Sequence, residues 1–421
     1  MSVFAPLIPL LLTAAILLAG NGLQGTLIAL RAIEEGFSPT TVGLIGAAYF
    51  AGFMAASVLA PKLVQRVGHI RVFGALAATA AAGTLSLVLI PEPITWGAIR
   101  FAMGFCFSGL FTIVESWLNE LSRNADRGRI LSVYRMIDLF TVAGIQFLLP
   151  AVGVGGFTAF AITAILFCLS LVPVSLGDRS SPKPPEDFHF DIAGVWRLSP
   201  LACAVTFTIG MTNAAFRLLG PVYARDIGLD ISGVAMFLSA GILGGGALQY
   251  PFGFLSDRFD RRVAIMVGTA GATLAGMALS FFADQGAIVV YLCSFLFGAF
   301  AMPLYSLAAA HANDRAREGQ FVLIAAGLLF FYAIGASIGP IIASIVMEQF
   351  GSPAFFIYTS VMHGSLIVAS IVRMAVSPAA PSERRTRFVA MLRTSPIQFR
   401  LTRRLARPGT QKDTTNASSS P

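Results

Sequence analysis

Two long apolar blocks, residues 4–177 and 199–376, dominate this chain and leave one polar segment between them. A helix that crosses a bilayer needs roughly 20 mostly apolar residues, so each block has room for six such helices. Hydrophobic residues make up 56% of the 421 residues, and charged residues only 12%. A water-soluble domain could not bury this much apolar surface, and the composition therefore predicts an integral membrane protein.

Hydropathy divides each block into six candidate spans. The spans expected in the first block are 5–30, 39–59, 71–90, 95–118, 130–150 and 157–176, and those in the second block are 200–223, 231–254, 263–283, 286–310, 320–347 and 354–376. These runs are longer than the about 9–11 residues of a membrane β-strand and do not alternate in polarity. The predicted fold is an all-α membrane protein with twelve transmembrane helices in two six-helix bundles.

Basic residues predict the orientation of the spans. They gather in the loops after the second, fourth, eighth and tenth spans, at Lys62, Arg66, Arg71, Arg123, Arg127, Arg129, Arg258, Arg261, Arg262, Arg315 and Arg317. The opposite loops offer only Arg31 and Arg225. The positive-inside rule therefore places both termini in the cytoplasm, with the spans in the cell inner membrane. The expected units are an N-terminal bundle at 1–177, a cytoplasmic linker at 178–198, a C-terminal bundle at 199–376 and a basic, partly disordered tail at 377–421.

The formal net charge of +8 does not indicate nucleic-acid binding, because much of the excess lies in this tail. There, arginines between Arg384 and Arg407 are interspersed with Phe388, Leu392, Phe399 and Leu405. Two interpretations stay open. The tail either fixes the orientation alone, or forms a basic amphipathic helix that lies on anionic lipid headgroups.

The two halves show a weak internal repeat. A shift of 192 residues aligns Gln65, in the loop after the second span, with Asp257 after the eighth span. A shift of 190 residues aligns Pro150 with Pro340. Equivalent loops and prolines at equivalent places indicate a structural duplication.

The loop after the eighth span carries a family resemblance. The segment Gly253-Phe-Leu-Ser-Asp257-Arg258-Phe-Asp-Arg261-Arg262 resembles the motif that follows the second or eighth helix in the major facilitator superfamily. The resemblance implies that Gly253 permits close helix approach, and that the aspartate and the three arginines form a charge cluster, so that these five residues act as a cytoplasmic gate. The first-half copy departs from the motif, with Pro61 and Gln65 at the glycine and aspartate positions, so the implied gate is asymmetric.

Three further segments extend the resemblance. Arg100-Phe-Ala-Met-Gly104 resembles a second motif of the superfamily, in which an arginine lies within the bundle. Glu115-Ser-Trp-Leu-Asn119 and Gln249-Tyr-Pro-Phe-Gly253 resemble the YcaD-like branch. The resemblance covers about residues 5–376 and implies a secondary transporter of twelve helices.

Ionisable side chains within spans cost roughly 2.5–3.5 kcal/mol each on insertion scales, so each one is a functional candidate. The spans contain Arg100, Glu115, Arg135, Asp138 and Arg217. Arg135 and Asp138 are three residues apart and can share a helix face. Two interpretations stay open for the cluster of Arg100, Glu115, Arg135 and Asp138. It either neutralises charge between helices, or couples transport to protonation of Glu115 or Asp138.

Uncharged polar residues in the spans suggest a substrate cavity. Together with Arg217, the candidates are Asn21, Gln24, Gln146, Asn213 and Gln249. Their helices, the first, fifth, seventh and eighth, commonly line the central cavity in proteins of this resemblance. Hydrogen bonds between helices would equally explain the amides, and snorkelling to the outer interface would explain Arg217.

The predicted function is alternating-access transport of a small organic solute, coupled to protons, by a monomer in a lipid bilayer. No nucleotide-binding motif, catalytic constellation or metal-ligand spacing is found, so neither an enzyme nor a cofactor or metal is expected. Two alternatives remain. The protein could export drugs or metabolites by proton antiport, or could be a non-transporting membrane sensor that acts through its tail.

Overall fold

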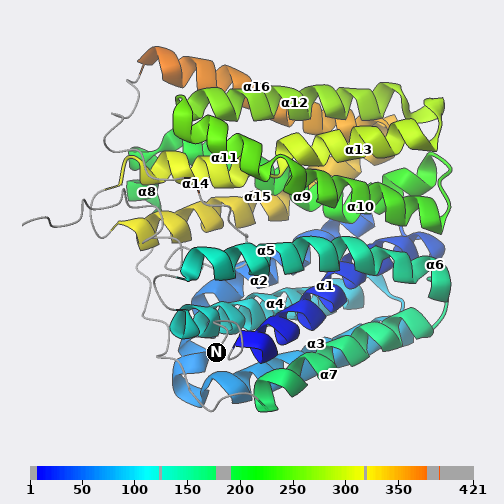
Figure 1. The fold of residues 1–421 in the computed structure, drawn as a ribbon. Coiled ribbons are helices and arrows are strands. Elements are labelled where there is room, and N and C mark those ends of the chain that lie inside the picture. The colour runs from blue at the N-terminus through cyan, green and yellow to red at the C-terminus, as the bar shows by residue number, and fades with distance from the viewer. Residues whose placement is uncertain (1–6, 123–125, 177–190, 317–319, 377–387, 389–421) are drawn as a thin grey trace, which may run out of the picture.

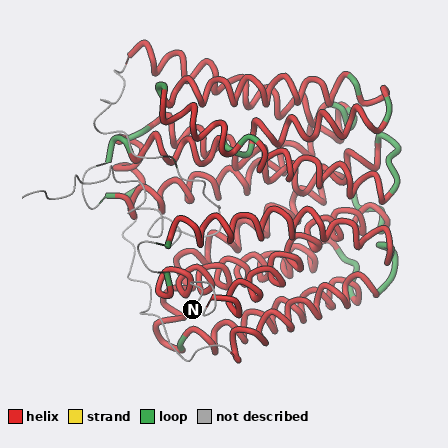
Figure 2. The backbone as a smooth tube through the Cα atoms, in the orientation of Figure 1, coloured by secondary structure: helices red, strands yellow, loops and turns green. Residues whose placement is uncertain are grey.

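The computed structural model describes residues 7–122, 126–176, 191–316, 320–376 and Phe388. Within these residues all regular structure is helical, and 12 helical stretches are long and apolar enough to cross a membrane. The helices run side by side along one common direction (Figures 1 and 2). The structure thus confirms the predicted all-α fold of twelve spans.

The helices form two groups, which Figure 1 shows one above the other. The first group contains α1 (Ile8–Glu34), α2 (Pro39–Val67), α3 (His69–Leu89), α4 (Pro93–Leu121), α5 (Arg127–Gly144), η2 (Ile145–Phe147), α6 (Leu148–Val152) and α7 (Thr158–Leu176). The second group contains α8 (Ile192–Leu198), α9 (Pro200–Asp226), α10 (Ile231–Ala247), α11 (Gln249–Arg258), α12 (Arg261–Phe281), η3 (Ala283–Gln285), α13 (Ala287–Ala301), α14 (Leu304–Asn313), α15 (Phe321–Phe350) and α16 (Ala354–Val376).

Three spans that the hydropathy predicts as continuous helices are interrupted. The fifth contains the 3-10 turn Ile145–Phe147, the eighth breaks at Leu248, and the tenth breaks before α14. Each break closely precedes a proline, at Pro150, Pro251 and Pro303 respectively. A proline has no N–H for the carbonyl four residues earlier, and its ring clashes with that carbonyl. A proline alone does not determine a break, however, because Pro61, Pro173, Pro221 and Pro340 lie within continuous helices.

Equivalent helices begin in the same way in both groups. At the start of α2, the Ser38 hydroxyl accepts a hydrogen bond from the N–H of Thr41 at 3.3 Å. At the start of α10, the Asp230 carboxylate accepts one from the N–H of Gly233 at 2.7 Å. Such caps satisfy N–H groups that have no partner within the helix. Asp230 lies 192 residues after Ser38, which matches the spacing of the sequence repeat.

A close helix crossing is also repeated. A Cβ atom on Gly104 of α4 would overlap the carbonyl oxygen of Tyr49 on α2. A Cβ atom on Gly298 of α13 would overlap the carbonyl oxygen of Gly241 on α10 in the same way. Gly241 lies 192 residues after Tyr49, and Gly298 lies 194 residues after Gly104. Only glycine permits so close an approach of two backbones, so the duplication has preserved the central crossing of each group.

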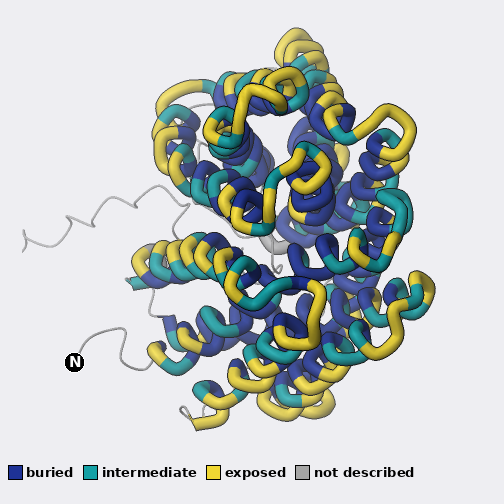
Figure 3. The backbone as a smooth tube through the Cα atoms, turned by 90° about the vertical axis from the view of Figure 1, so that its right-hand side faces the viewer, coloured by how far each residue is buried: buried dark blue, intermediate teal, exposed yellow. Residues whose placement is uncertain are grey.

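We call the end with the α1–α2 turn the outer end and the end with the α2–α3 turn the inner end, following the predicted orientation. In the outer half, the N–H of Thr40 donates to the Glu348 carboxylate at 3.0 Å. The Ser239 hydroxyl donates to the carbonyl oxygen of Ala143 at 2.7 Å. Both bonds join the first group to the second. Seen from the outer end, buried residues face the interior and exposed residues the periphery (Figure 3), as expected for helices surrounded by lipid.

Candidate functional site

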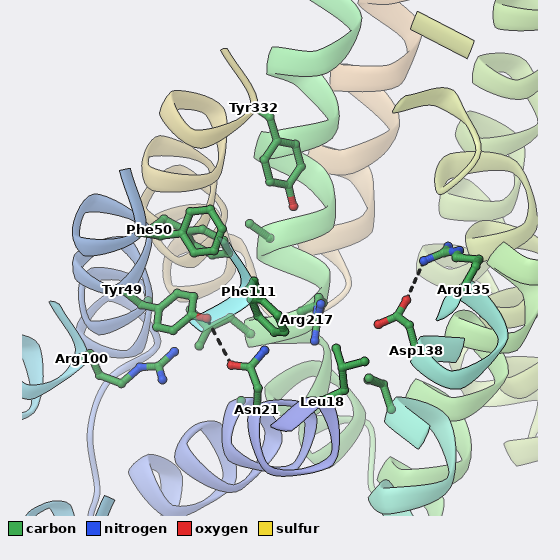
Figure 4. Close-up of a pocket in the computed structure, with 16 residues that line it drawn as sticks. Leu18, Asn21, Tyr49, Phe50, Arg100, Phe111, Arg135, Asp138, Arg217 and Tyr332 are labelled. Atoms are coloured by element: carbon green, nitrogen blue, oxygen red, sulfur yellow. Dashed lines mark hydrogen bonds and ion pairs between the residues drawn. The ribbon is translucent and has the colours of Figure 1, made fainter. Parts of the chain in front are cut away.

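A cavity of about 130 Å³ lies between the two groups of helices (Figure 4). Its lining combines charged, polar and aromatic side chains with small and aliphatic ones. The lining residues are Leu18, Asn21, Gly25, Gly46, Tyr49, Phe50, Phe53, Arg100, Phe111, Arg135, Asp138, Val142, Ala214, Arg217, Leu218 and Tyr332. They come from α1, α2, α4 and α5 of the first group and from α9 and α15 of the second.

Arg100 forms a buried cationic part of the cavity wall. Its guanidinium donates a hydrogen bond to the Gln24 amide oxygen at 3.1 Å, and the Gln24 amide nitrogen donates to Thr84 at 2.8 Å. The guanidinium also lies 4.2 Å from the ring centroid of Tyr49, close enough for a cation–π interaction. Arg100 is 5% exposed, and its Nε has no hydrogen-bond partner among the described residues. Gln24 therefore does not line the cavity but positions Arg100.

Arg135 and Asp138 form an ion pair on α5. Their side chains approach to 2.6 Å, and each is 19% exposed. The separation of three residues places both on one helix face, as the sequence predicts. Glu115 is fully buried beside the phenol of Tyr134 and does not line the cavity. Its membership of one cluster with the Arg135–Asp138 pair stays a prediction.

The second group contributes one charged residue to the cavity. Arg217 of α9 is exposed and makes no hydrogen bond or ion pair with any described residue. It lies near enough to Tyr49 for an electrostatic interaction across the two groups. Asn21 accepts a hydrogen bond from the Tyr49 hydroxyl at 3.1 Å. These residues bring α1, α2 and α9 to one place.

Three other predicted amides do not line the cavity, and two of them bond to neighbouring helices instead. Gln146 accepts a hydrogen bond from Thr26 at 2.7 Å and donates to backbone carbonyls. Gln249 donates to Ser306 at 3.1 Å. Asn213 is 1% exposed, and neither atom of its amide has a partner in the described part of the chain.

Part of the cavity wall is aromatic and consists of Tyr49, Phe50, Phe53, Phe111 and Tyr332. The sequence analysis did not predict Tyr49 or the three phenylalanines. The chain contains 35 phenylalanines, and nothing in the sequence distinguishes those that line a cavity from those that pack or face lipid. The short spacing within α2, over Tyr49, Phe50 and Phe53, is the one local cluster that could have indicated an aromatic wall.

At the inner end, Arg261 is the centre of a charge network. It donates to the two carboxylate oxygens of Asp314 at 2.5 and 3.2 Å, to the Ser256 hydroxyl at 2.8 Å and to Asp257 at 3.3 Å. The side chains of Arg261 and Asp314 are each 2% exposed. A buried ion pair needs such additional hydrogen bonds to offset its desolvation. The network ties α12 to α11 and to the end of α14, and Asp314 had not been predicted as a member.

The remaining gate residues surround this network. Arg262 pairs with Asp260 at 2.7 Å. Burial opposes ionisation of Asp260, but the hydrogen bonds and charge of Arg262 outweigh it and hold the pKa of that carboxyl below its ordinary value. The guanidinium of Arg258 lies 6.0 Å from the ring centroid of Phe254.

Phe388 reaches this network from the C-terminal segment. Its N–H donates to both carboxylate oxygens of Asp257, at 2.9 and 3.2 Å. Its ring lies where a Cβ atom on Gly253 would stand. The predicted amphipathic helix of the tail otherwise lies outside the described residues. In the part of the chain that the structure describes, no group of three or more His, Cys, Asp or Glu side chains could hold a metal ion.

Comparison with known proteins agrees with this architecture. A model of the Major Facilitator Superfamily matches residues 10–201 and 202–409. An uncharacterized MFS-type transporter of Enterobacter sp. (strain 638) is 28% identical over 371 residues, which cover 83% of this chain and 89% of that protein. The MFS-type transporter YcaD of Escherichia fergusonii is 26% identical over 364 residues, which cover 85% of this chain and 93% of YcaD.

Solved structures share the fold. A mutant of the nucleoside transporter NupG superimposes with a TM-score of 0.75 at 10% identity, over 87% of this chain and 98% of NupG. A bacterial homolog of the human lysosomal transporter Spinster, in an inward-facing and unoccupied conformation, superimposes with a TM-score of 0.67 at 13% identity. The match covers 95% of this chain and 97% of that protein. At such identities the likeness concerns the fold alone. With the family model matching both halves, the chain belongs to the Major Facilitator Superfamily, a family of multi-pass membrane transporters and not of enzymes.

Proposed function

We propose that this superfamily member carries a small organic solute by alternating access and couples its movement to protons. The observation that supports this most is the central cavity, which is walled by helices of both groups and contains the Arg135–Asp138 ion pair. When two helical bundles rock about a shared site, that site can open to one side of the membrane at a time.

The outer half of the molecule supports a state that is closed toward the outside. The Thr40–Glu348 and Ser239–Ala143 hydrogen bonds join the groups there, and outward opening must break both. We propose that both termini and the linker at 178–198 are cytoplasmic, so that this state exchanges solute with the cytoplasm. We also propose that the transporting unit is a monomer.

The charge network at the inner end supports a gate that belongs to the second half. Arg261 connects α11, α12 and α14 through Asp257 and Asp314, so the inner ends of these helices move together. We propose that Gly253, Asp257 and the neighbouring arginines regulate inner closure. The first half has Gln65 at the equivalent of Asp257 and contributes no matching carboxylate at this position.

Proton coupling would use Asp138. In the described state, the Asp138 carboxylate is paired with the Arg135 guanidinium at 2.6 Å. If rocking of the bundles separates the pair, a carboxylate in a poorly hydrated cavity favours its neutral form and takes up a proton. The return movement re-forms the pair and releases that proton, which links the two conformations to protonation.

Proteoliposomes test this coupling. A solute is first identified by thermal-shift screening of the purified protein against a metabolite library, and its uptake is measured with and without a pH gradient. We expect Asp138→Asn to bind the solute but to accumulate it no more with the gradient than without. Glu120→Gln, an exposed acid at the inner end of α4, is the matched control and should behave as wild type. Gradient-driven accumulation by Asp138→Asn would remove Asp138 from the mechanism.

A further inference from the structure

We propose that the central cavity takes an organic anion, whose carboxylate or phosphate is held between Arg100 and Arg217 and whose apolar part contacts the aromatic wall. This inference rests on the proposed transport function and assigns the chemical class of its solute. It starts from an imbalance of charge. The cavity lining contains three arginines but one acid, Asp138, and that acid is already paired with Arg135.

Arg100 has polar neighbours that orient it but do not neutralise it. The Gln24 amide and the Tyr49 ring are both uncharged, and the Nε of this buried side chain has no partner among the described residues. A guanidinium taken out of water costs several kcal/mol unless an anion compensates it. The site is therefore pre-formed for a negative group that arrives with the solute.

Arg217 supplies the second cation from the opposite bundle. It is exposed, lines the same cavity and has no hydrogen-bond or ion-pair partner in the described part of the chain. The planar forks of two guanidiniums match the paired oxygens of a carboxylate or phosphate. An anion held by both would bridge α4 and α9, so binding would favour conformations in which the two bundles are close.

The rest of the lining indicates what the anion is attached to. Phe50, Phe111 and Tyr332 provide apolar surface beside the arginines. Ligand sites typically combine such apolar walls with a few polar groups that fix orientation. Inorganic phosphate alone would leave these walls without a partner, so the expected solute has an apolar or aromatic part.

Gly25 offers a reporter position. It lines the cavity, and a Cβ atom placed on it would meet nothing within 4 Å. Of the four cysteines, which are all free, only Cys168 is exposed, so Cys168→Ala provides the background. Gly25→Cys in the purified full-length protein is then reacted with anionic MTSES or cationic MTSET, methanethiosulfonates of similar size. Each rate is divided by that of the same reagent with 2-mercaptoethanol.

We expect MTSES to be favoured over MTSET by about tenfold, because clefts lined by one sign of charge concentrate the opposite sign. Arg217→Gln should lower this ratio by at least about threefold. Arg225→Gln on the same helix is the control and should leave it unchanged, since Arg225 donates to the Leu229 carbonyl at the outer end. Equal rates for the two reagents, or a preference for MTSET, would overturn the proposal.

Protection of Gly25→Cys then distinguishes the negative groups. Benzoate, phenyl phosphate and neutral benzyl alcohol are added at equal concentration before MTSES. Stronger protection by benzoate indicates a carboxylate solute, and stronger protection by phenyl phosphate indicates a phosphate ester. Protection by benzyl alcohol that equals or exceeds both would overturn the anion proposal. It would leave the transport proposal intact, because that proposal fails only if the reconstituted protein moves no solute.

Discussion

The α2–α4 and α10–α13 crossings have the same backbone contact and different chemistry. In both, a glycine allows one helix to touch a carbonyl of the other, at Gly104 in the first half and Gly298 in the second. At the first crossing, Tyr49 and Arg100 project toward the cavity. The equivalent positions in the second half hold Gly241 and Ser294, by the same shifts of 192 and 194 residues.

The duplication has preserved the helix contacts but not the charges. Where the first half has an arginine stacked on a tyrosine, the second has Ser294, which donates to the Phe237 carbonyl at 2.7 Å. The ring of Phe216 lies where a Cβ atom on Gly241 would stand. The second half fills this place with apolar packing, whereas the first leaves a cation beside the cavity. The buried ion pair of the second half, Arg261–Asp314, lies at the inner end.

A methyl group added at the glycine of the helix crossing should destabilise both halves equally. Gly104→Ala and Gly298→Ala are each expected to lower stability by about 3 kcal/mol, because their methyl groups would overlap carbonyl oxygens that belong to rigid helices. Thermal unfolding in detergent measures this effect. Gly97→Ala and Gly364→Ala are matched controls with open space around the new methyl group, and should raise the melting temperature slightly. A large difference between the Gly104 and Gly298 variants would break the equivalence of the crossings.

Substitutions at Arg100 and at the equivalent Ser294 should have different effects on the cavity. Arg100→Ser gives the first crossing the residue of the second. It should lower the rate of MTSES modification of Gly25→Cys by about tenfold, because one of the cations that concentrate the anionic reagent in the cavity is lost. Ser294→Ala should leave that rate unchanged and cost about 1 kcal/mol of stability through its lost hydrogen bond. Similar rates for the two variants would show that the charge asymmetry has no effect on the cavity.

The smallest effect is expected at the eroded loop motif. Gln65→Asp restores the aspartate of the motif in the first half, yet should change stability by less than about 0.5 kcal/mol. The position equivalent to Arg261 is His69, whose ring packs against Trp117 at 5.6 Å between centroids. A new carboxylate at 65 therefore meets no buried arginine there. Stabilisation by more than 1 kcal/mol, measured by thermal unfolding, would show a first-half network that resembles the second.

Much of the fold could be predicted because the bilayer constrains it. A span must be apolar and long, so hydropathy alone finds the twelve spans. The helix breaks before Pro150, Pro251 and Pro303 were missed because the surrounding residues remain apolar. Proline chemistry makes these three positions candidates for a break, but it does not single them out, because α2, α7, α9 and α15 each continue through a proline.

The candidate site was predicted unevenly for a physical reason. Charges in a span are costly, and four of the five predicted ones, Arg100, Arg135, Asp138 and Arg217, line the cavity, whereas Glu115 is fully buried outside its lining. An amide costs less and can be satisfied by a neighbouring helix, as for Gln146 and Gln249. Its presence in a span therefore does not tell which way it faces.

The contact of Phe388 with Gly253 and Asp257 has a practical consequence for anyone who prepares this protein. A shortened protein that ends before residue 388 would lack both the ring that packs against Gly253 and the N–H that donates to the Asp257 carboxylate. Affinity tags and truncation points therefore belong beyond that phenylalanine.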